Sequence, residues 1–238
     1  MTSPSSPVTL ITGASRGIGQ AIALQLSQRG HTVILSGRDL DGLAITQTLI
    51  REQGQEAHLL RADINDADQR CELITQIQQQ YGRIDVLVNN AGVALDKWIK
   101  GSDVSLELCR QTFDTNVWAC LHLCQLVLPS MREQGYGRIV NLSSELASLT
   151  EMQMGMTLAY RASKTTLNAI TRILAIEHQD CDNIKINAAA PGWVKTDLGG
   201  DDAPLTPEQG ADTPVWLACL PKNGPSGGFF RERELYPW

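Results

Sequence analysis

Two side chains that could transfer a proton, Tyr160 and Lys164, stand four residues apart. On a helix this spacing puts both on one face. A free phenol has a pKa of about 10, and a neighbouring ammonium favours the phenolate and lowers that pKa. The pair therefore indicates a general acid or base built on Tyr160. Such a pair also arises by chance on half-exposed helices, so the rest of the chain has to decide between the two interpretations.

The start of the chain has the pattern of a dinucleotide site. An apolar strand from Val8 leads through Gly13, Gly17 and Gly19 into an amphipathic helix. Glycines permit a tight turn and a close approach of the backbone to a pyrophosphate, whose charge is favoured by the free N–H groups at a helix start. The spacing is Gly-x-x-x-Gly-x-Gly rather than the common Gly-x-Gly-x-x-Gly.

Apolar strands and amphipathic helices alternate along the chain. We expect strands near 8–12, 32–36, 57–61, 84–89, 137–142 and 184–189, and helices near 17–29, 40–53, 66–81, 103–134 and 157–179. This alternation predicts an α/β fold with a doubly wound parallel sheet of about seven strands and helices on both faces. Ligands of such sheets bind beyond the carboxyl ends of the strands, where the motifs that follow each strand should meet.

The segment from Gly199 to Trp238 is richer in proline and glycine. It predicts a loop, a helix capped by Thr206 with Pro207 at its first position, and a last strand near Gly228–Glu234. The chain shows no internal repeat or linker. We therefore expect a single domain over residues 1–238, with residues 1–7 as a disordered tail.

The composition limits the partners and the compartment. The net charge of −6 argues against nucleic acid and anionic membranes as partners. No apolar run is long enough to cross a bilayer, and residues 1–7 lack the basic start and apolar core of a signal peptide. We expect a cytoplasmic protein with no membrane or nucleic-acid partner.

The six cysteines show no Cys-x-x-Cys pair, and most of them fall within apolar patterns. Cys120 and Cys124 share a helix face, but no histidine or second cysteine pair is placed to complete a tetrahedral site. We therefore expect buried thiols of a reducing compartment and no metal.

Several motifs resemble those of the short-chain dehydrogenase/reductase family. They follow the family's order and span nearly the whole chain. Thr12–Gly19 resembles that family's cofactor turn, Asp63–Ile64 its adenine-contacting pair, Asn89–Gly92 the motif after its fourth strand and Pro191–Gly192 the turn after its sixth. The resemblance implies a single-domain Rossmann fold and an oxidoreductase that uses a nicotinamide cofactor. The residues that resemble the family's catalytic set are Asn116, Ser143–Ser144, Tyr160 and Lys164.

The resemblance also implies which residues hold the cofactor. Asp63 would accept from the adenine amine, and Asn90 with Gly92 would shape the floor beneath adenosine and ribose. Thr196 would bind the phosphates or the carboxamide. A surface aspartate and a helix-capping threonine are the simpler alternatives for Asp63 and Thr196. The full set is Gly13, Ser15, Arg16, Gly17, Ile18, Gly19, Arg38, Asp63, Ile64, Asn90, Ala91, Gly92, Tyr160, Lys164, Pro191, Gly192, Val194 and Thr196.

Charge indicates which nicotinamide cofactor binds. The second strand ends at Arg38, where an NAD-specific site usually carries an acidic residue for the ribose 2′-hydroxyl. Arg38 and Arg16 could instead hold a 2′-phosphate, each charge-assisted contact contributing roughly 1.5–3 kcal/mol. We therefore predict NADP(H). The alternative is that both arginines are solvated surface charges, with Asp39 nearby.

The resemblance implies a role for each catalytic residue. Ser144 would hydrogen-bond the substrate oxygen, and Tyr160 would donate its proton as a hydride arrives from the nicotinamide. Lys164 would lower the pKa of the tyrosine and hold the cofactor ribose. Asn116, expected in mid-helix, would hold a water that relays protons to the lysine.

Two adjacent serines compete for the substrate oxygen, because Ser143 and Ser144 point to opposite faces at a strand end. The family places its serine four residues before a small residue that opens the next loop. Ser144 stands in that relation to Ser148, so we favour Ser144.

The substrate must be inferred from loops that are less informative. Between Ser144 and Tyr160 lie Met152, Met154 and Met156, which could form an adaptable apolar wall. This wall predicts a small hydrophobic aldehyde, ketone or quinone, in a pocket that includes Ser144, Met154 and Trp193. Leu95, Trp98, Trp193 and Leu198 could extend this wall. The alternative is that the methionines and these residues are core residues beneath a loop.

The segment Pro191–Leu198 looks like the carbonyl reductase branch of the family, but the chain lacks that branch's long insertion before the tyrosine. Homodimer, homotetramer and monomer therefore all stay open. One alternative function is 3-oxoacyl-acyl-carrier-protein reductase, against which Glu133, Asp180 and Asp182 would repel an acidic carrier. Another is a non-catalytic NADP(H) sensor or scaffold, which would usually have lost part of the catalytic set.

Overall fold

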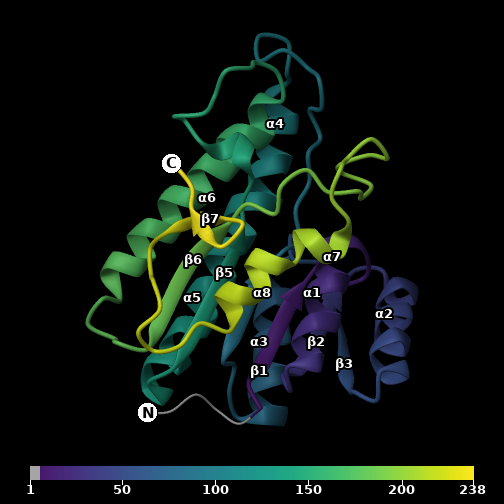
Figure 1. Ribbon diagram of the computed structural model, residues 1–238, viewed down its shortest axis with the longest axis vertical. Helices are drawn as coiled ribbons and strands as arrows, with labels where there is room; N and C mark the ends of the chain where they lie inside the picture. Colours follow the sequence, from purple (N-terminus) through teal and green to yellow (C-terminus); the bar gives the residue numbers. More distant parts are fainter. Residues whose placement is uncertain (1–5) are drawn as a thin grey trace.

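The computed structural model describes residues 6–238. Within these residues eight strands form one sheet, in the order β3-β2-β1-β4-β5-β6-β7-β8 (Figure 1). Neighbouring strands run parallel except β7 and β8, which are antiparallel. The strands are β1 (Val8–Thr12), β2 (Thr32–Gly37), β3 (Ala57–Arg61), β4 (Val86–Asn89), β5 (Gly137–Leu142), β6 (Ile184–Ala189), β7 (Phe229–Arg231) and β8 (Glu234–Leu235).

Helices cover both faces of this sheet. The α-helices are α1 (Gly17–Gln28), α2 (Leu40–Glu52), α3 (Ala67–Tyr81), α4 (Leu106–Phe113), α5 (Ala119–Gln134), α6 (Leu158–Glu177), α7 (Pro207–Gly210) and α8 (Asp212–Ala218). A π-helical turn, η1 (Asp114–Trp118), joins α4 to α5, and a 3-10 turn, η2 (Glu145–Ala147), follows β5.

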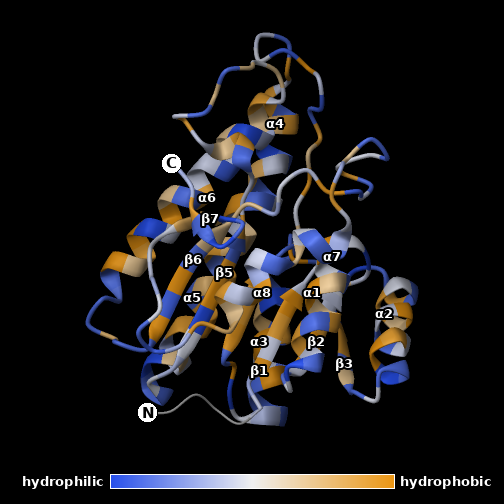
Figure 2. Ribbon diagram, viewed as in Figure 1, coloured by the Kyte–Doolittle hydropathy of each residue, from blue (hydrophilic) through white to orange (hydrophobic). Residues whose placement is uncertain are grey.

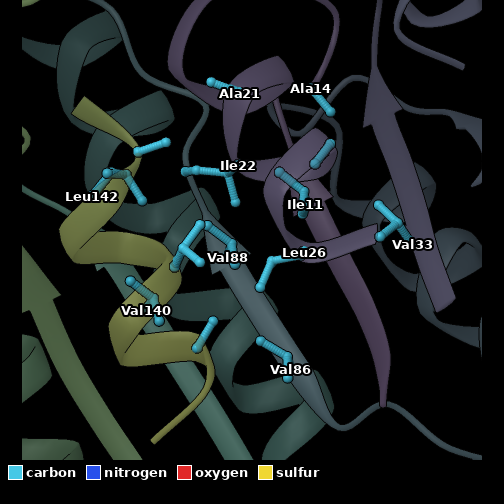
Figure 3. Close-up of a cluster of buried hydrophobic side chains, with 14 of the residues drawn as sticks. Ile11, Ala14, Ala21, Ile22, Leu26, Val33, Val86, Val88, Val140 and Leu142 are labelled. Atoms are coloured by element: carbon cyan, nitrogen blue, oxygen red, sulfur yellow. The ribbon is translucent and has the colours of Figure 1, made fainter. Parts of the chain in front are cut away.

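Two apolar clusters pack the helices onto the sheet. One cluster joins the sheet to α1, α2 and α8, and the other joins the opposite face to α3, α5 and α6. Ile11 belongs to the first and Leu10 to the second, because successive side chains of a strand point to opposite faces. Figure 3 shows the first cluster, with Ile22 and Leu26 of α1 lying over Val86 and Val88 of β4.

Burial on both faces explains the composition of the strands. β1 is buried at each of its five residues, and the central strands are coloured mainly as hydrophobic in Figure 2. The helices instead carry hydrophilic residues on their outer sides (Figure 2). A parallel sheet with helices on both faces requires this pattern.

The predicted fold class is confirmed, and six strands lie within two residues of their expected positions. Thr206 caps α7 through a reciprocal capping box with Gln209, and Pro207 occupies the first helical position, as predicted. Of the predicted tail, residues 1–5 lie outside the described residues. The other two are hydrogen-bonded: the Ser6 hydroxyl donates to the Gly30 carbonyl over 3.0 Å, and the Pro7 carbonyl accepts from Thr32 N–H.

Two predicted elements are wrong in detail. The last strand, expected over Gly228–Glu234, is a hairpin of β7 and β8, because Glu232 and Arg233 adopt positive φ and reverse the chain. The helix expected over 103–134 begins only at Leu106 and is interrupted by the π-helical turn η1. Asn116 lies within that turn rather than in a regular helix.

Candidate active site

The predicted motifs meet at the carboxyl edge of the sheet. The glycine turn follows β1, Asn89–Gly92 closes β4, Ser143–Ser144 follow β5 and Pro191–Gly192 follow β6. These four strands are consecutive neighbours in the sheet. Segments far apart in the sequence are therefore brought together at one edge, where doubly wound sheets bind ligands.

The glycine turn has the conformation that its sequence predicts. Gly13 and Gly17 have φ of +64° and +58°, in the left-handed region that favours glycine. A Cβ at Gly19 would lie 2.2 Å from the Gly13 carbonyl oxygen, so only glycine fits there. Gly19 therefore lets the start of α1 pack directly against the backbone of the turn.

The first turn of α1 can bind an anion. Its N-cap residue, Arg16, is extended and provides no side-chain cap for the helix N–H groups. Ser15 is partly buried before it, and Ile18 packs at the border of the first apolar cluster. The uncapped N–H donors and the helix dipole suit a pyrophosphate, so the residues at this helix start fit a dinucleotide.

Asn90 ties the glycine turn to the end of β4. Its side-chain amide donates to the carbonyl oxygens of Thr12 and Gly13 over 2.9 and 3.0 Å. In return the Thr12 hydroxyl accepts the N–H groups of Asn90 and Ala91, each over 3.1 Å. Asn90 therefore shapes the turn by holding its backbone.

The two arginines predicted to hold a 2′-phosphate are exposed and face acids. Arg16 Nε lies 2.7 Å from Asp197 Oδ2, and a guanidinium nitrogen of Arg16 lies 3.9 Å from Asp39. Arg38 lies 3.9 Å from Asp63. Asp39 accepts the Gly42 N–H and so caps α2, which gives its carboxylate a structural use.

The predicted adenine-contacting pair has one partly buried and one buried member. Ile64 is buried in the second apolar cluster. Asp63 Oδ1 accepts the Asn65 N–H over 3.0 Å, and its backbone N–H donates to Gln69. This orders the turn between β3 and α3 and leaves Oδ2 of Asp63 facing Arg38.

Tyr160 and Lys164 lie on one face of α6, as predicted, and both are buried. The Lys164 ammonium lies 5.9 Å from the centre of the Tyr160 ring. Burial raises the pKa of Tyr160 above its usual value, a hydrogen bond with Ser144 opposes that rise, and the charge of Glu145 adds to it. The phenol is therefore protonated at neutral pH.

This direction differs from the expected lowering of the Tyr160 pKa by Lys164. The ammonium donates to the Leu142 carbonyl oxygen over 2.7 Å and lies over the tyrosine ring rather than at its hydroxyl. Burial also lowers the pKa of Lys164 itself. Desolvation is the largest cause of the raised pKa of Tyr160, and it outweighs the hydrogen bond with Ser144.

The two serines after β5 have different surroundings. Ser143 is buried, and its hydroxyl donates to the Lys164 carbonyl oxygen over 3.4 Å. Ser144 is partly exposed, accepts the Leu146 N–H over 3.2 Å and hydrogen-bonds Tyr160. This geometry supports Ser144 as the serine of the site.

Asn116 is fully buried, and its side chain anchors the segment that follows β4. Its Oδ1 accepts the Val93 N–H over 2.9 Å, and its Nδ2 donates to the Val93 carbonyl and to the Ser163 hydroxyl. A Cβ at Gly92 would lie 3.3 Å from both Asn116 Oδ1 and Lys164 Nζ. Asn116 and Lys164 therefore flank Gly92. π-helical turns are often found at functional sites.

The loop after β6 lies beside the glycine turn at the carboxyl edge of the sheet. Gly192 has φ of +82°, and Val194 is buried and bridges to Leu205. The Thr196 hydroxyl accepts the Gly199 N–H over 3.0 Å, while its methyl group lies near Gly17. Pro191 leads into this loop and is partly buried. The structure thus brings the predicted cofactor residues of this loop beside the first turn of α1.

The predicted apolar wall is exposed. Met154 is 63% and Trp193 51% exposed, and the Trp193 indole donates to the Gly199 carbonyl over 2.8 Å. The alternative that these side chains are core residues beneath a loop is therefore wrong. The other exposed members are Leu95, Trp98, Met152, Met156 and Leu198.

The sequence did not single out two acids beside the site. Glu145 follows Ser144, and its carboxylate pairs with Arg231 over 2.7 Å. Asp96 is fully buried and accepts the N–H groups of Ala159 and Tyr160. Neither acid had a local signal, because each partner is distant in the sequence.

The cysteine prediction is only partly right. Cys120 and Cys124 are buried, and burial raises the pKa of Cys120 to about 11. Cys71 and Cys219 are exposed, however, and Cys109 and Cys181 are partly exposed. Helix register and loop position, rather than residue type, set this exposure.

A cavity of about 560 Å³ at the end of α6 and the start of β6 contains none of the predicted site residues. In the described part of the chain, no helix combines the length and apolar character needed to cross a membrane.

Comparison with known proteins identifies the family. A family model described as short chain dehydrogenase matches residues 7–204. Mouse carbonyl reductase (NADPH) 1 is 31% identical over 99% of this chain and 100% of its own, and mouse carbonyl reductase (NADPH) 3 is 33% identical over 98% and 99%. The first alignment spans 281 positions against 238 residues here, so the relative carries insertions that this chain lacks.

Solved structures agree. The NADPH-bound carbonyl reductase from chicken fatty liver is 26% identical with a TM-score of 0.86, and covers 98% of this chain and 99% of its own. The carbonyl reductase Sniffer of D. melanogaster is 27% identical with a TM-score of 0.87, over 98% and 100%. With the motifs and geometry above, these matches show that the chain belongs to the short-chain dehydrogenase/reductase family and is similar to its carbonyl reductases.

Proposed function

We propose that this protein reduces the carbonyl group of an aldehyde, ketone or quinone to an alcohol with NADPH, and that Tyr160 is the general acid. The observation that carries this proposal is the buried, protonated Tyr160, hydrogen-bonded to Ser144 and beside Lys164 at the edge that holds the glycine turn. The similarity to carbonyl reductases named for NADPH supports the same reaction.

The cofactor would be held by residues that follow β1, β2, β3, β4 and β6, and by two residues of α6. The backbone of Gly13, Ser15, Gly17, Ile18 and Gly19 would face the pyrophosphate, because the free N–H groups and dipole of α1 favour that charge. Asp63 and Ile64 would contact the adenine. The remaining residues would line the riboses, the phosphates and the nicotinamide, namely Asn90, Ala91, Gly92, Tyr160, Lys164, Pro191, Gly192, Val194 and Thr196.

Arg16 and Arg38 would bind the 2′-phosphate and so favour NADP(H). Both guanidinium groups are exposed, and Asp39 and Asp63 face them at 3.9 Å in weak contacts, while Asp197 pairs with Arg16 over 2.7 Å in an exposed ion pair. Asp39 stands where it could have held a ribose 2′-hydroxyl, but it caps α2. Arginine presents several donors in a fixed plane that matches a phosphate.

In the reaction the chain's own residues handle the proton. When bound, reduced nicotinamide supplies a hydride to the carbonyl carbon. Ser144 donates a hydrogen bond to the carbonyl oxygen, and Tyr160 Oη gives that oxygen the proton that completes the alcohol. Lys164 would then help to return a proton to the phenolate, which its charge stabilises. Asn116 would keep Val93 and Gly92 in place beside Lys164.

The exposed apolar rim supports a hydrophobic substrate. Met154 and Trp193 lie at the same edge as Ser144 and remain open to solvent. Flexible methionine side chains adapt to substrates of different shapes, and the tryptophan offers a flat apolar face. A small aromatic or aliphatic carbonyl compound would cover these side chains on binding.

The test is NADPH oxidation, followed by absorbance, over a panel of aromatic aldehydes, quinones, aliphatic ketones and an acetoacetyl thioester, with NADH as the parallel cofactor. We expect turnover of the hydrophobic carbonyl compounds with NADPH and much less with NADH. Turnover of the thioester alone would favour an acyl-carrier-protein reductase. NADPH binding without turnover of any compound would contradict the proposed reaction and favour a sensor.

A further inference from the structure

A buried carboxylate caps the catalytic helix from another part of the chain. Asp96 is fully buried, in the loop between β4 and α4. Its Oδ2 accepts the Ala159 N–H over 2.6 Å, and its Oδ1 accepts the Tyr160 N–H over 3.2 Å. Both carboxylate oxygens therefore bind the first turn of α6, and one of them binds the backbone of the proposed general acid.

The helix has no cap of its own. Thr157, its N-cap residue, has φ of 53° and ψ of 43° and makes no side-chain cap hydrogen bond. An N-cap side chain normally accepts the N–H groups of the second or third helical residue from an extended backbone. Thr157 has the left-handed conformation instead, so Asp96 takes over the second and third N–H groups of α6.

Further contacts hold the Asp96 loop against the helix start. The Thr157 N–H donates to the Ile99 carbonyl over 3.0 Å, and the Trp98 N–H donates to the Thr157 hydroxyl over 3.2 Å. Trp98, Met156 and Thr157 all have positive φ. Non-glycine residues persist in this region only where their surroundings fix them, and such residues cluster at functional sites.

The other end of this loop is also fixed to the site. Val93, three residues before Asp96, is held through both backbone groups by the side chain of Asn116. The loop therefore joins Asn116 to the backbone of Tyr160. Asp96 takes part in none of the ion pairs among the described residues. Burying such a carboxylate is costly, and its two N–H hydrogen bonds and the dipole of α6 offset that cost.

We propose that Asp96 is a positioning residue, which fixes the backbone of Tyr160 so that the phenol is aimed at the substrate oxygen beside Ser144. This inference rests on the proposed function. Asp96 touches neither Ser144 nor the phenol hydroxyl, so it acts through the start of α6. Its loss should therefore lower the rate of the chemical step far more than cofactor affinity, because the glycine turn and most other cofactor residues belong to different parts of the edge.

The test compares Asp96→Ala and Asp96→Asn with a matched cap elsewhere. Asp66 is the control, because it also accepts two backbone N–H groups at a helix start, those of Asp68 and Gln69 of α3, beside the Gln69 side-chain amide. For each variant we would measure kcat and KM with the best carbonyl compound of the panel and NADPH affinity by fluorescence. We would also measure the melting temperature and the hydrogen exchange of the Ala159 and Tyr160 amides.

We expect Asp96→Ala to lower kcat at least ~tenfold, since a small misplacement of a catalytic group costs much of its rate. NADPH affinity should fall much less than kcat, and the two amides should exchange faster. Asp96→Asn keeps one acceptor oxygen and should recover part of the rate, and it carries the test if the alanine variant does not fold. Asp66→Ala should lower the melting temperature without lowering kcat.

Equal kcat in wild type, Asp96→Ala and Asp66→Ala would overturn the proposal, as would a loss of kcat matched by an equal loss of NADPH affinity. If the wild type reduces no compound of the panel, the proposed function fails. The exchange of the two amides then still decides whether Asp96 holds the backbone of Tyr160, and unchanged exchange in Asp96→Ala would overturn that as well.

Discussion

Arg16 and Asp197 form an ion pair, with Nε of the arginine 2.7 Å from Oδ2 of the aspartate. Arg16 precedes α1, and Asp197 lies in the loop after β6, so the pair joins the two sides of the proposed cofactor site. The Gly17 backbone and the Thr196 methyl group meet beside it. Asp197 therefore engages the Arg16 guanidinium group, which we propose binds the 2′-phosphate.

Removing this competitor should tighten NADPH binding. In Asp197→Asn, Arg16 would be free to bind the phosphate, and an exposed ion pair is worth up to about 1 kcal/mol, or roughly a fivefold change in affinity. NADH, which lacks the phosphate, should bind as before. Asp201→Asn, an exposed acid of the same loop, is the control. Titration of cofactor fluorescence measures both affinities, and unchanged or weaker NADPH binding in Asp197→Asn would show that Asp197 does not compete.

Gly19→Ala should abolish most cofactor binding. The added Cβ would lie 2.2 Å from the Gly13 carbonyl oxygen and 2.4 Å from the Asn90 amide nitrogen, so the turn must move. We expect NADPH affinity to fall at least ~tenfold, because the backbone donors no longer converge on the pyrophosphate. Gly155→Ala is the control, since a Cβ there would meet nothing within 4 Å. Equal affinity of both variants in a fluorescence titration would place the pyrophosphate elsewhere.

His31 should make stability depend on pH. It is buried against the Thr9 hydroxyl, 2.7 Å from Nδ1, and burial lowers its pKa to about 4. The unfolded chain takes up this proton below about pH 6.5, whereas the folded protein does so only near 4. The folded state is therefore favoured above pH 6.5 and loses up to about 3 kcal/mol as the pH falls toward 4.

The measurement is urea unfolding between pH 7 and 4.5. His31→Asn keeps a polar partner for Thr9 but has no group that titrates in this range, so its free energy of unfolding should fall less steeply with decreasing pH than that of the wild type. If both proteins lose stability in parallel, the carboxylates alone cause the pH dependence.

Local patterns predicted most of the fold. The apolar runs of β1, β2 and β6 and the glycine turn depend on neighbouring residues, and the structure has them where the sequence indicated. The hairpin of β7 and β8 was missed because Glu232 and Arg233 reverse the chain without a glycine or proline. A sequence pattern gives no sign of positive φ at such residues.

The site was predicted where it depends on motifs, and was missed where it depends on tertiary contacts. Asp96 caps a helix 63 positions further along the chain, so no local capping pattern marks it. The π-helical turn at Asn116 is likewise not visible in the helical period of 103–134. The pKa of Tyr160 was predicted from its neighbour Lys164, but its direction follows from burial, which only the packed structure reveals.

The most direct test of the account is the rate of the reaction in Tyr160→Phe, which removes one hydroxyl and keeps the ring in the core. We predict that kcat for carbonyl reduction falls at least ~100-fold, the usual contribution of a positioned acid, while NADPH still binds. Steady-state kinetics beside a cofactor titration decides this. A variant that binds NADPH and turns over within a few fold of the wild-type rate would contradict the assignment of Tyr160 as the general acid.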